Sequence, residues 1–236
     1  CSHPIAVPSK PCDSMASPTA VGGRRPDGSL RARSNALLQG RYNRSELKPV
    51  LPLALGHYLS SRLRSGERIV AITFGNGACA VRAFVGMNGG ACCTSSNAGA
   101  VFDWARAGGE SPQDGPAKIL FLPDQHLGRN TAHARGLRTE VDGAVDGDSR
   151  LAETVLWDPR KDGGAEDDAY RAAEVVLWAG HCSVHRLFRP EHVAAARSED
   201  PDCTVIVHPE CCQEVVDLAD LAGSTEYIID VLSKTV

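Results

Sequence analysis

The sequence has few aromatic residues, no long apolar run and no surplus of positive charge. Aromatic residues make up 5% of the chain, and its formal net charge is -4 at pH 7. Without a basic surplus, the sequence does not predict nucleic-acid binding. No segment approaches the roughly 18 consecutive apolar residues that a membrane-spanning helix requires. Neither nucleic acid nor a membrane is therefore an expected partner.

The chain has nine cysteines, yet no C-x-x-C pair occurs. The number is odd, and the adjacent pairs Cys92-Cys93 and Cys211-Cys212 suit neither a disulfide framework nor a zinc knuckle. Two interpretations stay open. The cysteines are buried free thiols in a reducing compartment, or some of them are ligands of a soft metal, brought together from distant positions.

The composition is otherwise that of an ordinary globular protein. Of the 236 residues, 42% are hydrophobic and 23% are charged, which suits one large domain or two small ones. The chain begins with Cys1 rather than Met, and no apolar signal core follows. We therefore expect a fragment, a processed form or an incomplete gene model.

Two stretches lack hydrophobic periodicity. Residues 1–47 are rich in Pro, Ser, Gly and Arg, and 17–34 predict a loop or a disordered insert. We expect order to begin near Leu47, with a lead-in helix whose apolar face lies within 51–63. Residues 139–170 are acidic and glycine-rich and predict an irregular surface excursion. Their acidic residues do not follow the EF-hand order, so calcium binding is not expected.

Between these stretches, β-branched runs alternate with amphipathic segments. The runs predict buried strands and the segments predict helices. Such repetition is typical of an α/β protein with parallel sheets covered on both faces. The expected strands are 68–74, 118–122, 175–178 and 204–207; the expected helices are 79–85, 101–106, 125–136, 190–198 and 213–221; and 227–232 is either a strand or a short helix.

Chemically active residues follow each expected strand. Asn76 follows the first strand, Asp124 the second and Cys182 the third, and His208 comes directly after the fourth. Because ligands of open α/β sheets bind at the carboxyl ends of the strands, we expect a site at that edge.

Two motifs with a cysteine or histidine are candidates for catalysis. In GHCSVH at 180–185, Cys182 with His185 can be a metal ligand, a nucleophile or a packed thiol. A cysteine hydrolase is one alternative, although no third orienting group is evident in the sequence. In VIVHPEC at 205–211, His208 and Glu210 form an acid/base pair, or else a surface histidine and a first-turn glutamate favoured by the helix dipole.

Two hydroxyl-rich motifs can hold an anion. CTSSNA at 93–98 can present Ser95 and backbone N–H groups to a ligand, or Ser95 or Ser96 is simply a helix N-cap. AGST at 222–225 can form a phosphate or carboxylate cradle, or a C-cap followed by an N-cap. The sequence leaves both pairs of interpretations open.

In this order the four motifs resemble those of quinolinate synthases, the quinolinate synthetase A family. The resemblance covers roughly half of the chain, and the long last string is the most specific part of it. The matching strings are CTSSNA, ILFLPDQHLGRNTA, VLWAGHCSVH and VIVHPECCQEVVDLADLAGST, and ITFGNGACAVRAF is similar to the family's Y-x-N strand end and the helix after it.

The resemblance implies three related α/β/α domains, each three-layered with a short parallel sheet, in a pseudo-threefold arrangement. This chain would represent them only in part. The expected division is 1–16 as a remnant of the first domain with a candidate cluster cysteine, 17–66 as the insert and lead-in helix, 67–180 as the second α/β domain with an insert at 139–170, and 181–236 as a partial third α/β domain.

The resemblance also implies a reaction and a cofactor. Quinolinate synthases condense iminoaspartate with dihydroxyacetone phosphate to quinolinate in NAD biosynthesis. They use a four-iron four-sulfur (4Fe-4S) cluster, held by one cysteine from each domain, as a Lewis acid. The implied functional partner is L-aspartate oxidase or aspartate dehydrogenase. The implied compartment is the cytoplasm, or the plastid stroma for a eukaryotic protein.

Carried over position by position, the family's pattern assigns roles to single residues. His208 and Glu210 match the catalytic, substrate-contacting pair, and Cys182 matches the cluster ligand of the middle domain. His185 is expected to support the cluster cysteine. Further substrate contacts match Phe74, Asn76, Ser95, Ser224 and Thr225, and Cys12 in PCDSMA is a second candidate cluster ligand.

The chain departs from the family at three points. Phe74 stands where the family has Tyr, so the side chain has no hydroxyl. PCDSMA around Cys12 has one residue more than the family's GCS[LM]A stretch. The third cluster cysteine would fall beyond Val236. A degenerate, non-catalytic relative that acts as a binding or regulatory module is therefore the alternative to an enzyme.

Overall fold

The computed structural model describes residues 67–141, 152–161 and 163–234. Cys12 and the expected lead-in helix lie outside the described residues. So does the middle of the expected insert at 139–170. Among the described residues, no helix combines the length and the apolar character needed to cross a membrane.

The main sheet has five parallel strands in the order β2-β1-β3-β5-β4. Its central strands are runs of Val, Ile, Leu and Phe that are almost entirely buried, as expected of a parallel sheet with both faces covered. The strands are β1 (Ile69–Phe74), β2 (Ala91–Cys93), β3 (Lys118–Leu122), β4 (Thr154–Trp157) and β5 (Val175–Trp178).

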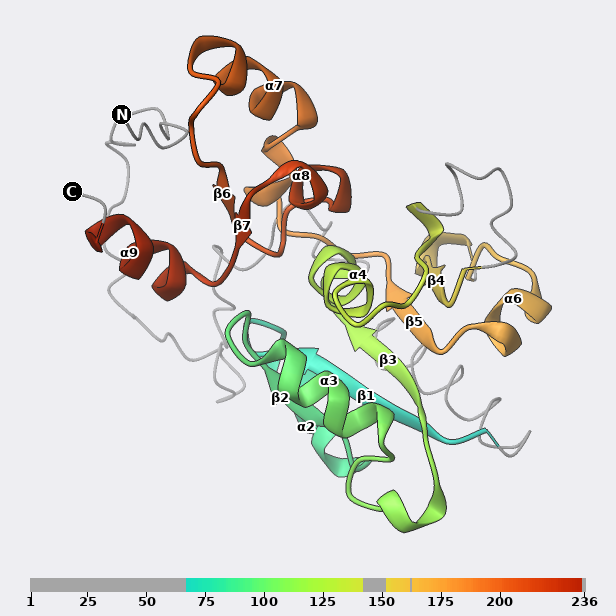
Figure 1. Ribbon diagram of the computed structural model, residues 1–236. Coiled ribbons are helices and arrows are strands. Elements are labelled where there is room, and N and C mark those ends of the chain that lie inside the picture. Colours follow the sequence, from blue (N-terminus) through green and yellow to red (C-terminus); the bar gives the residue numbers. More distant parts are fainter. Residues whose placement is uncertain (1–66, 142–151, 162, 235–236) are drawn as a thin grey trace, which may run out of the picture.

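Helices cover both faces of this sheet, which makes three layers (Figure 1). Strand residues alternate between two apolar cores: Leu120 and Val176 belong to the core under α2 and α6, whereas Ile119 and Leu177 belong to the core under α3 and α4. The helices are α2 (Cys79–Met87), α3 (Ala98–Arg106), α4 (Gln125–His133) and α6 (Asp167–Ala172). The prediction of a three-layer α/β fold is confirmed.

A second, smaller parallel sheet follows in the chain. It consists of β6 (Ile206–Val207) and β7 (Leu221–Ala222) and has its own apolar core, which includes Val193, Val205 and Val215. Its helices are α7 (Pro190–Glu199), α8 (Gln213–Leu218) and α9 (Thr225–Lys234). Helix α4 of the first sheet packs against α8 of this second unit (Figure 1). The pseudo-threefold arrangement and the domain boundary at 180/181 stay predictions.

Several element boundaries differ from the sequence prediction. The expected strand 204–207 is shortened to β6, because Val205 uses its N–H to bind the Asp220 carboxylate instead of a neighbouring strand. The expected helix 213–221 ends at Leu218, and Leu221 belongs to β7. Residues 227–232, left open as strand or helix, lie in α9.

The expectation of an irregular excursion over 139–170 is wrong for the described part of that segment. Thr154–Trp157 forms β4, which pairs in register with β5 from Thr154↔Val175 to Trp157↔Trp178. Its residues pack against the same core as α6, because Val155 and Trp157 join Tyr170 there. Between the acidic and glycine-rich flanks, the four residues TVLW, three of them apolar, are long enough for an edge strand.

Candidate active site

The candidate site lies where β5 ends and the chain turns toward the second sheet. Gly180 O accepts a hydrogen bond from Gln125 N at 2.8 Å, so the loop after β5 is tied to the start of α4. Asp124, the N-cap of α4, accepts hydrogen bonds from Leu127 N at 2.9 Å and from Cys182 N at 2.8 Å. One carboxylate therefore both begins the helix and fixes the backbone of Cys182.

Burial dominates the ionisation of Asp124. Its side chain is 5% exposed, and desolvation raises its pKa to about 7, a rise that the Glu210 charge reinforces and the hydrogen bond from Leu127 N opposes. A carboxyl group with such a pKa exchanges its proton near neutral pH. Asp124 only accepts the hydrogen bond from Cys182 N, and a carboxyl group has an acceptor oxygen whether or not it is protonated. The contact can therefore persist in both protonation states of Asp124.

The segment His208–Glu210 forms the opposite wall of the site. His208 is 8% exposed and Glu210 is 5% exposed, so the alternative of a surface histidine is wrong. The Asn130 side chain, from α4, donates hydrogen bonds to Pro209 O and Cys211 O, both at 2.8 Å. Helix α4 therefore positions this segment as well as the Cys182 loop.

Three side chains from these two segments converge. One ligand atom each from Cys182, His185 and Glu210 lie within 4.8 Å of one another. His185 Nδ1 is 2.7 Å from Glu210 Oε2. Glu210 is thus the third group beside Cys182 and His185. The sequence did not make it evident, because Glu210 lies 25 positions after His185.

His208 completes the group through its ring. The imidazoles of His185 and His208 stack with centroids 4.4 Å apart and planes 7° apart. His208 Nδ1 accepts a hydrogen bond from Glu210 N at 3.3 Å and lies 3.9 Å from Glu210 Oε2. Desolvation lowers the pKa of His208, and the neighbouring His185 adds to this, whereas Glu210 opposes it. The neutral ring, with Nε2 as the protonated nitrogen, therefore dominates at neutral pH.

The other predicted residues lie at the ends of further strands and helices. Phe74 ends β1, half-buried against the core under α3 and α4, and Asn76 is exposed in the turn after it. Strand register places Phe74 opposite Cys93 at the end of β2, and half-buried Ser95 follows two residues later. Ser224 is buried and Thr225 exposed at the start of α9. The structure thus unites Cys182, His185, His208 and Glu210, and it places these five residues at other strand and helix ends.

Local hydrogen bonds show which residues of the two hydroxyl-rich motifs cap a helix. Helix α3 begins after Asn97, whose side-chain oxygen accepts a hydrogen bond from Thr94 N at 2.6 Å, so the alternative of Ser95 or Ser96 as N-cap is wrong. Ser224 Oγ accepts from Tyr227 N at 3.3 Å, as an N-cap residue does. An anion-binding role for either motif stays a prediction.

Two other cysteines near the site are packed thiols. Cys93 and Cys211 are 1% and 2% exposed, and burial raises their pKa values to about 12 and about 11. Such thiols stay protonated at neutral pH and make poor nucleophiles or metal ligands. Cys182 is a free, half-buried thiol beside His185 and Glu210, which distinguishes it from these two.

A group of basic side chains adjoins the Cys182 loop. The rings of His126 and His181 meet edge to face at 6.4 Å, Arg129 Nη1 lies 3.5 Å from His126 Nδ1, and Arg186 Nη1 lies 3.2 Å from His181 Nε2. Burial, followed by Arg129 and His181, lowers the pKa of His126 to about 4. No local pattern in the sequence indicates this group, because its members come from α4 and from the segment after β5.

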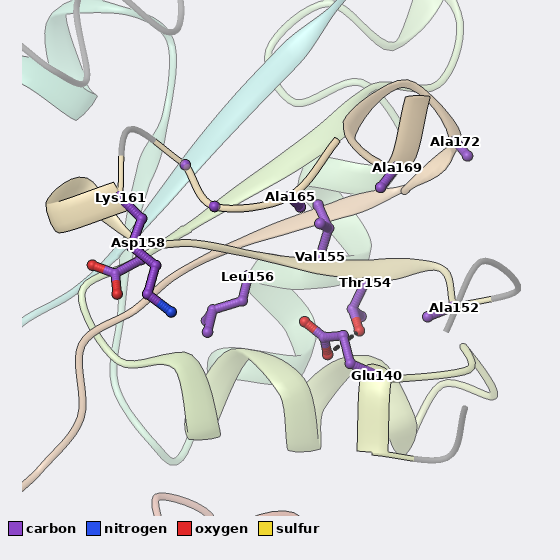
Figure 2. Close-up of a pocket in the computed structure, with 12 residues that line it drawn as sticks. Glu140, Ala152, Thr154, Val155, Leu156, Asp158, Lys161, Ala165, Ala169 and Ala172 are labelled. Carbon is purple, nitrogen blue, oxygen red and sulfur yellow. Dashed lines mark hydrogen bonds between the residues drawn. The ribbon is translucent and has the colours of Figure 1, made fainter. Parts of the chain in front are cut away.

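Figure 2 shows a cavity elsewhere, over the edge strand β4 between Lys161 and α6. Its volume is about 260 Å³, and its lining includes Thr154, Leu156 and Glu140. Glu140 Oε2 accepts from Thr154 Oγ1 at 2.7 Å and pairs with Arg129 Nε at 3.1 Å. None of the residues predicted from the sequence lines this cavity.

Fold and site together define an α/β protein that gathers a thiol, an imidazole and a carboxylate at the carboxyl edge of a parallel sheet. The family model for quinolinate synthetase A protein matches residues 57–236. Similar curated proteins are the quinolinate synthases of Bacillus subtilis, 43% identical over 169 residues, Herpetosiphon aurantiacus, 46% over 168, and Acidobacterium capsulatum, 48% over 164.

These alignments cover 69–72% of this chain but only 39–41% of the relatives, so the chain spans about two-fifths of the length of the curated proteins it matches. The match is long and specific enough to decide the family. The chain belongs to the quinolinate synthetase A family.

Proposed function

We propose that this chain is part of a quinolinate synthase that condenses iminoaspartate with dihydroxyacetone phosphate, using a 4Fe-4S cluster. The observation that carries the proposal is the convergence of Cys182, His185, Glu210 and His208, four residues of two family motifs, at one edge of the sheet. Membership of the family supplies the reaction type.

The donor set around Cys182 is compatible with a cluster. Its thiol is free and half-buried, and it sits at the carboxyl edge, where such folds bind ligands. Beside it, His185 Nδ1 is buried without a hydrogen-bond partner that meets normal geometry among the described residues. Cys182 and Cys12 are the cluster ligands that we propose in this chain. A bound cluster with an open iron would supply Lewis-acid activation of a substrate oxygen.

The remaining roles belong to this chain's own side chains. Neutral His208, whose Nδ1 accepts a hydrogen bond from Glu210 N, can donate a hydrogen bond from Nε2 to a substrate oxygen, and Glu210 is the side chain that we propose to move a proton. Asn76, Ser95, Ser224 and Thr225 are proposed to hold the anionic substrates through hydrogen bonds. Phe74 is proposed to pack against the substrate without contributing a hydroxyl.

The experiment measures iron, acid-labile sulfide and the electronic spectrum of the full-length gene product purified without oxygen. We expect a brown protein with about four irons. The Cys182→Ser variant should be colourless, whereas the matched Cys212→Ser variant, also a half-buried free thiol, should stay brown. Equal colour in all three proteins would refute the role of Cys182.

A degenerate binding module is the second candidate, and Phe74 is the observation that favours it. Quinolinate formation should be measured for the wild type and for Phe74→Tyr, which restores the family's residue. Activity in the wild type supports the enzyme. A cluster-loaded wild type without activity, together with an active Phe74→Tyr variant, supports degeneration at this position.

The proposed enzyme also implies a functional partner and a compartment. Iminoaspartate hydrolyses readily, so a nearby source such as L-aspartate oxidase or aspartate dehydrogenase is the proposed functional partner. We propose the cytoplasm as the compartment, or the plastid stroma for a eukaryotic protein. Co-purification of either partner with the tagged full-length gene product tests the first proposal.

A further inference from the structure

Cys182, His185 and Glu210 also resemble a site for a single metal ion. A cluster is held by cysteine thiolates, whereas this trio offers one sulfur, one imidazole nitrogen and one carboxylate oxygen. Zinc accepts all three donor types, and three protein ligands leave its fourth position open. The chemistry of the trio therefore suits zinc in the absence of a cluster.

The distances between the donors are close to those of a tetrahedral site. Zinc–ligand bonds of about 2.0–2.3 Å place neighbouring donors about 3.3–3.7 Å apart. His185 Nδ1 and Glu210 Oε2, now 2.7 Å apart, must separate by less than about 1 Å. The whole trio, spread over at most 4.8 Å, must close by about 1 Å. Rotamer adjustments are sufficient for movements of this size.

The surroundings hold the trio in place before any metal binds. Asp124 fixes the Cys182 backbone, and the His208 ring supports the His185 ring. Asn130 holds the carbonyl groups on both sides of Glu210. Contacts of this kind orient metal ligands and raise affinity.

We propose that Cys182, His185 and Glu210 bind one zinc ion when the cluster is absent. The Cys182 thiol loses its proton to solvent as the sulfur–zinc bond forms, and the ion's open fourth position is filled by water. Zinc and cluster assembly then compete for the same thiolate, and this competition, unlike zinc binding itself, rests on the proposed function.

The test is a cobalt titration of the metal-free, reduced chain without oxygen. Cobalt replaces zinc, and a thiolate ligand gives an intense near-ultraviolet charge-transfer band. We expect the band to saturate at one cobalt per chain and to disappear when one equivalent of zinc is added. The band should be absent in Cys182→Ser and retained in the matched Cys212→Ser variant.

The other two ligands need variants that preserve shape. His185→Gln and Glu210→Gln should keep the band but weaken zinc binding by about 10-fold or more. Circular dichroism and thermal melting without metal identify any variant that has lost its fold. A band that persists in Cys182→Ser, or unchanged zinc affinity in both glutamine variants, would overturn the proposal.

The outcomes also separate zinc binding from the proposed function. A full-length gene product that builds its cluster while the chain binds no zinc leaves the function intact and rejects this inference. Zinc binding at the trio without any cluster in the full-length gene product supports the inference and rejects the function. If both hold, one equivalent of zinc added before iron and sulfide should lower the iron incorporated.

Discussion

Helix α4 lies close to the main sheet at Gly128. A Cβ atom added there would lie 2.7 Å from Leu177 Cδ2 and 2.8 Å from two atoms of the Phe121 ring. Both neighbours are fully buried in the core under α3 and α4, so they cannot move away freely. Overpacking of a core typically costs 1–3 kcal/mol, while replacing a helical glycine by alanine contributes about 1 kcal/mol. We expect Gly128→Ala to lower the free energy of unfolding by about 1 kcal/mol.

Gly86 in α2 provides the matched control. It is exposed, and a Cβ there would meet no atom within 4 Å, so only the helix propensity changes. We expect Gly86→Ala to raise the free energy of unfolding by about 0.5 kcal/mol. Urea denaturation of the wild type and both variants, followed by circular dichroism, measures the difference. Equal stabilisation by the two substitutions would refute the close packing of α4 on β3 and β5.

Two further predictions concern α4. Asn130→Ala removes two hydrogen bonds, to Pro209 O and to Cys211 O, and should lower the free energy of unfolding by about 2 kcal/mol in urea denaturation. The control is Asn88→Ala at an exposed helix end, which should change the free energy of unfolding by less than about 1 kcal/mol. Because the pKa of His126 is lowered to about 4, His126 in the folded chain takes up its proton at a lower pH than in the unfolded chain. Its contribution to stability is therefore complete above about pH 6.5 and is lost as the pH falls toward 4. An NMR titration of His126 with a midpoint above 6 would contradict this.

The sequence predicts the strands whose apolar runs are unbroken. IVAITF, KILFL and VVLW lie at the centre of the sheet, where burial on both faces demands continuous apolar residues. Edge strands lack this signal. Strand β2 is only ACC, and β4 stands between acidic, glycine-rich flanks, so neither could be recognised by periodicity. Their places follow from pairing with β1 and β5, which is a property of the whole sheet.

The candidate site also has a part that the sequence predicts and a part that it does not. Cys182, His208 and Glu210 were predictable because each follows an expected strand in a motif of the family. The pairing of His185 with Glu210 was not, since it joins a loop after β5 to a loop after β6. The burial of His208 depends on the same meeting of two sheets, which no local pattern records.

Helix α4 explains why the two loops meet. Asp124 at its start binds the Cys182 backbone, and Asn130, about 9 Å further along the axis, binds the segment that carries Glu210. A shift of the whole helix, as Gly128→Ala would cause, carries both loops together, so it should lower stability while leaving the cobalt band and zinc affinity almost unchanged. Asn130→Ala releases only one loop. It should therefore weaken zinc binding as well as stability. If Gly128→Ala weakened zinc binding while Asn130→Ala left it unchanged, α4 would not couple the two halves of the site.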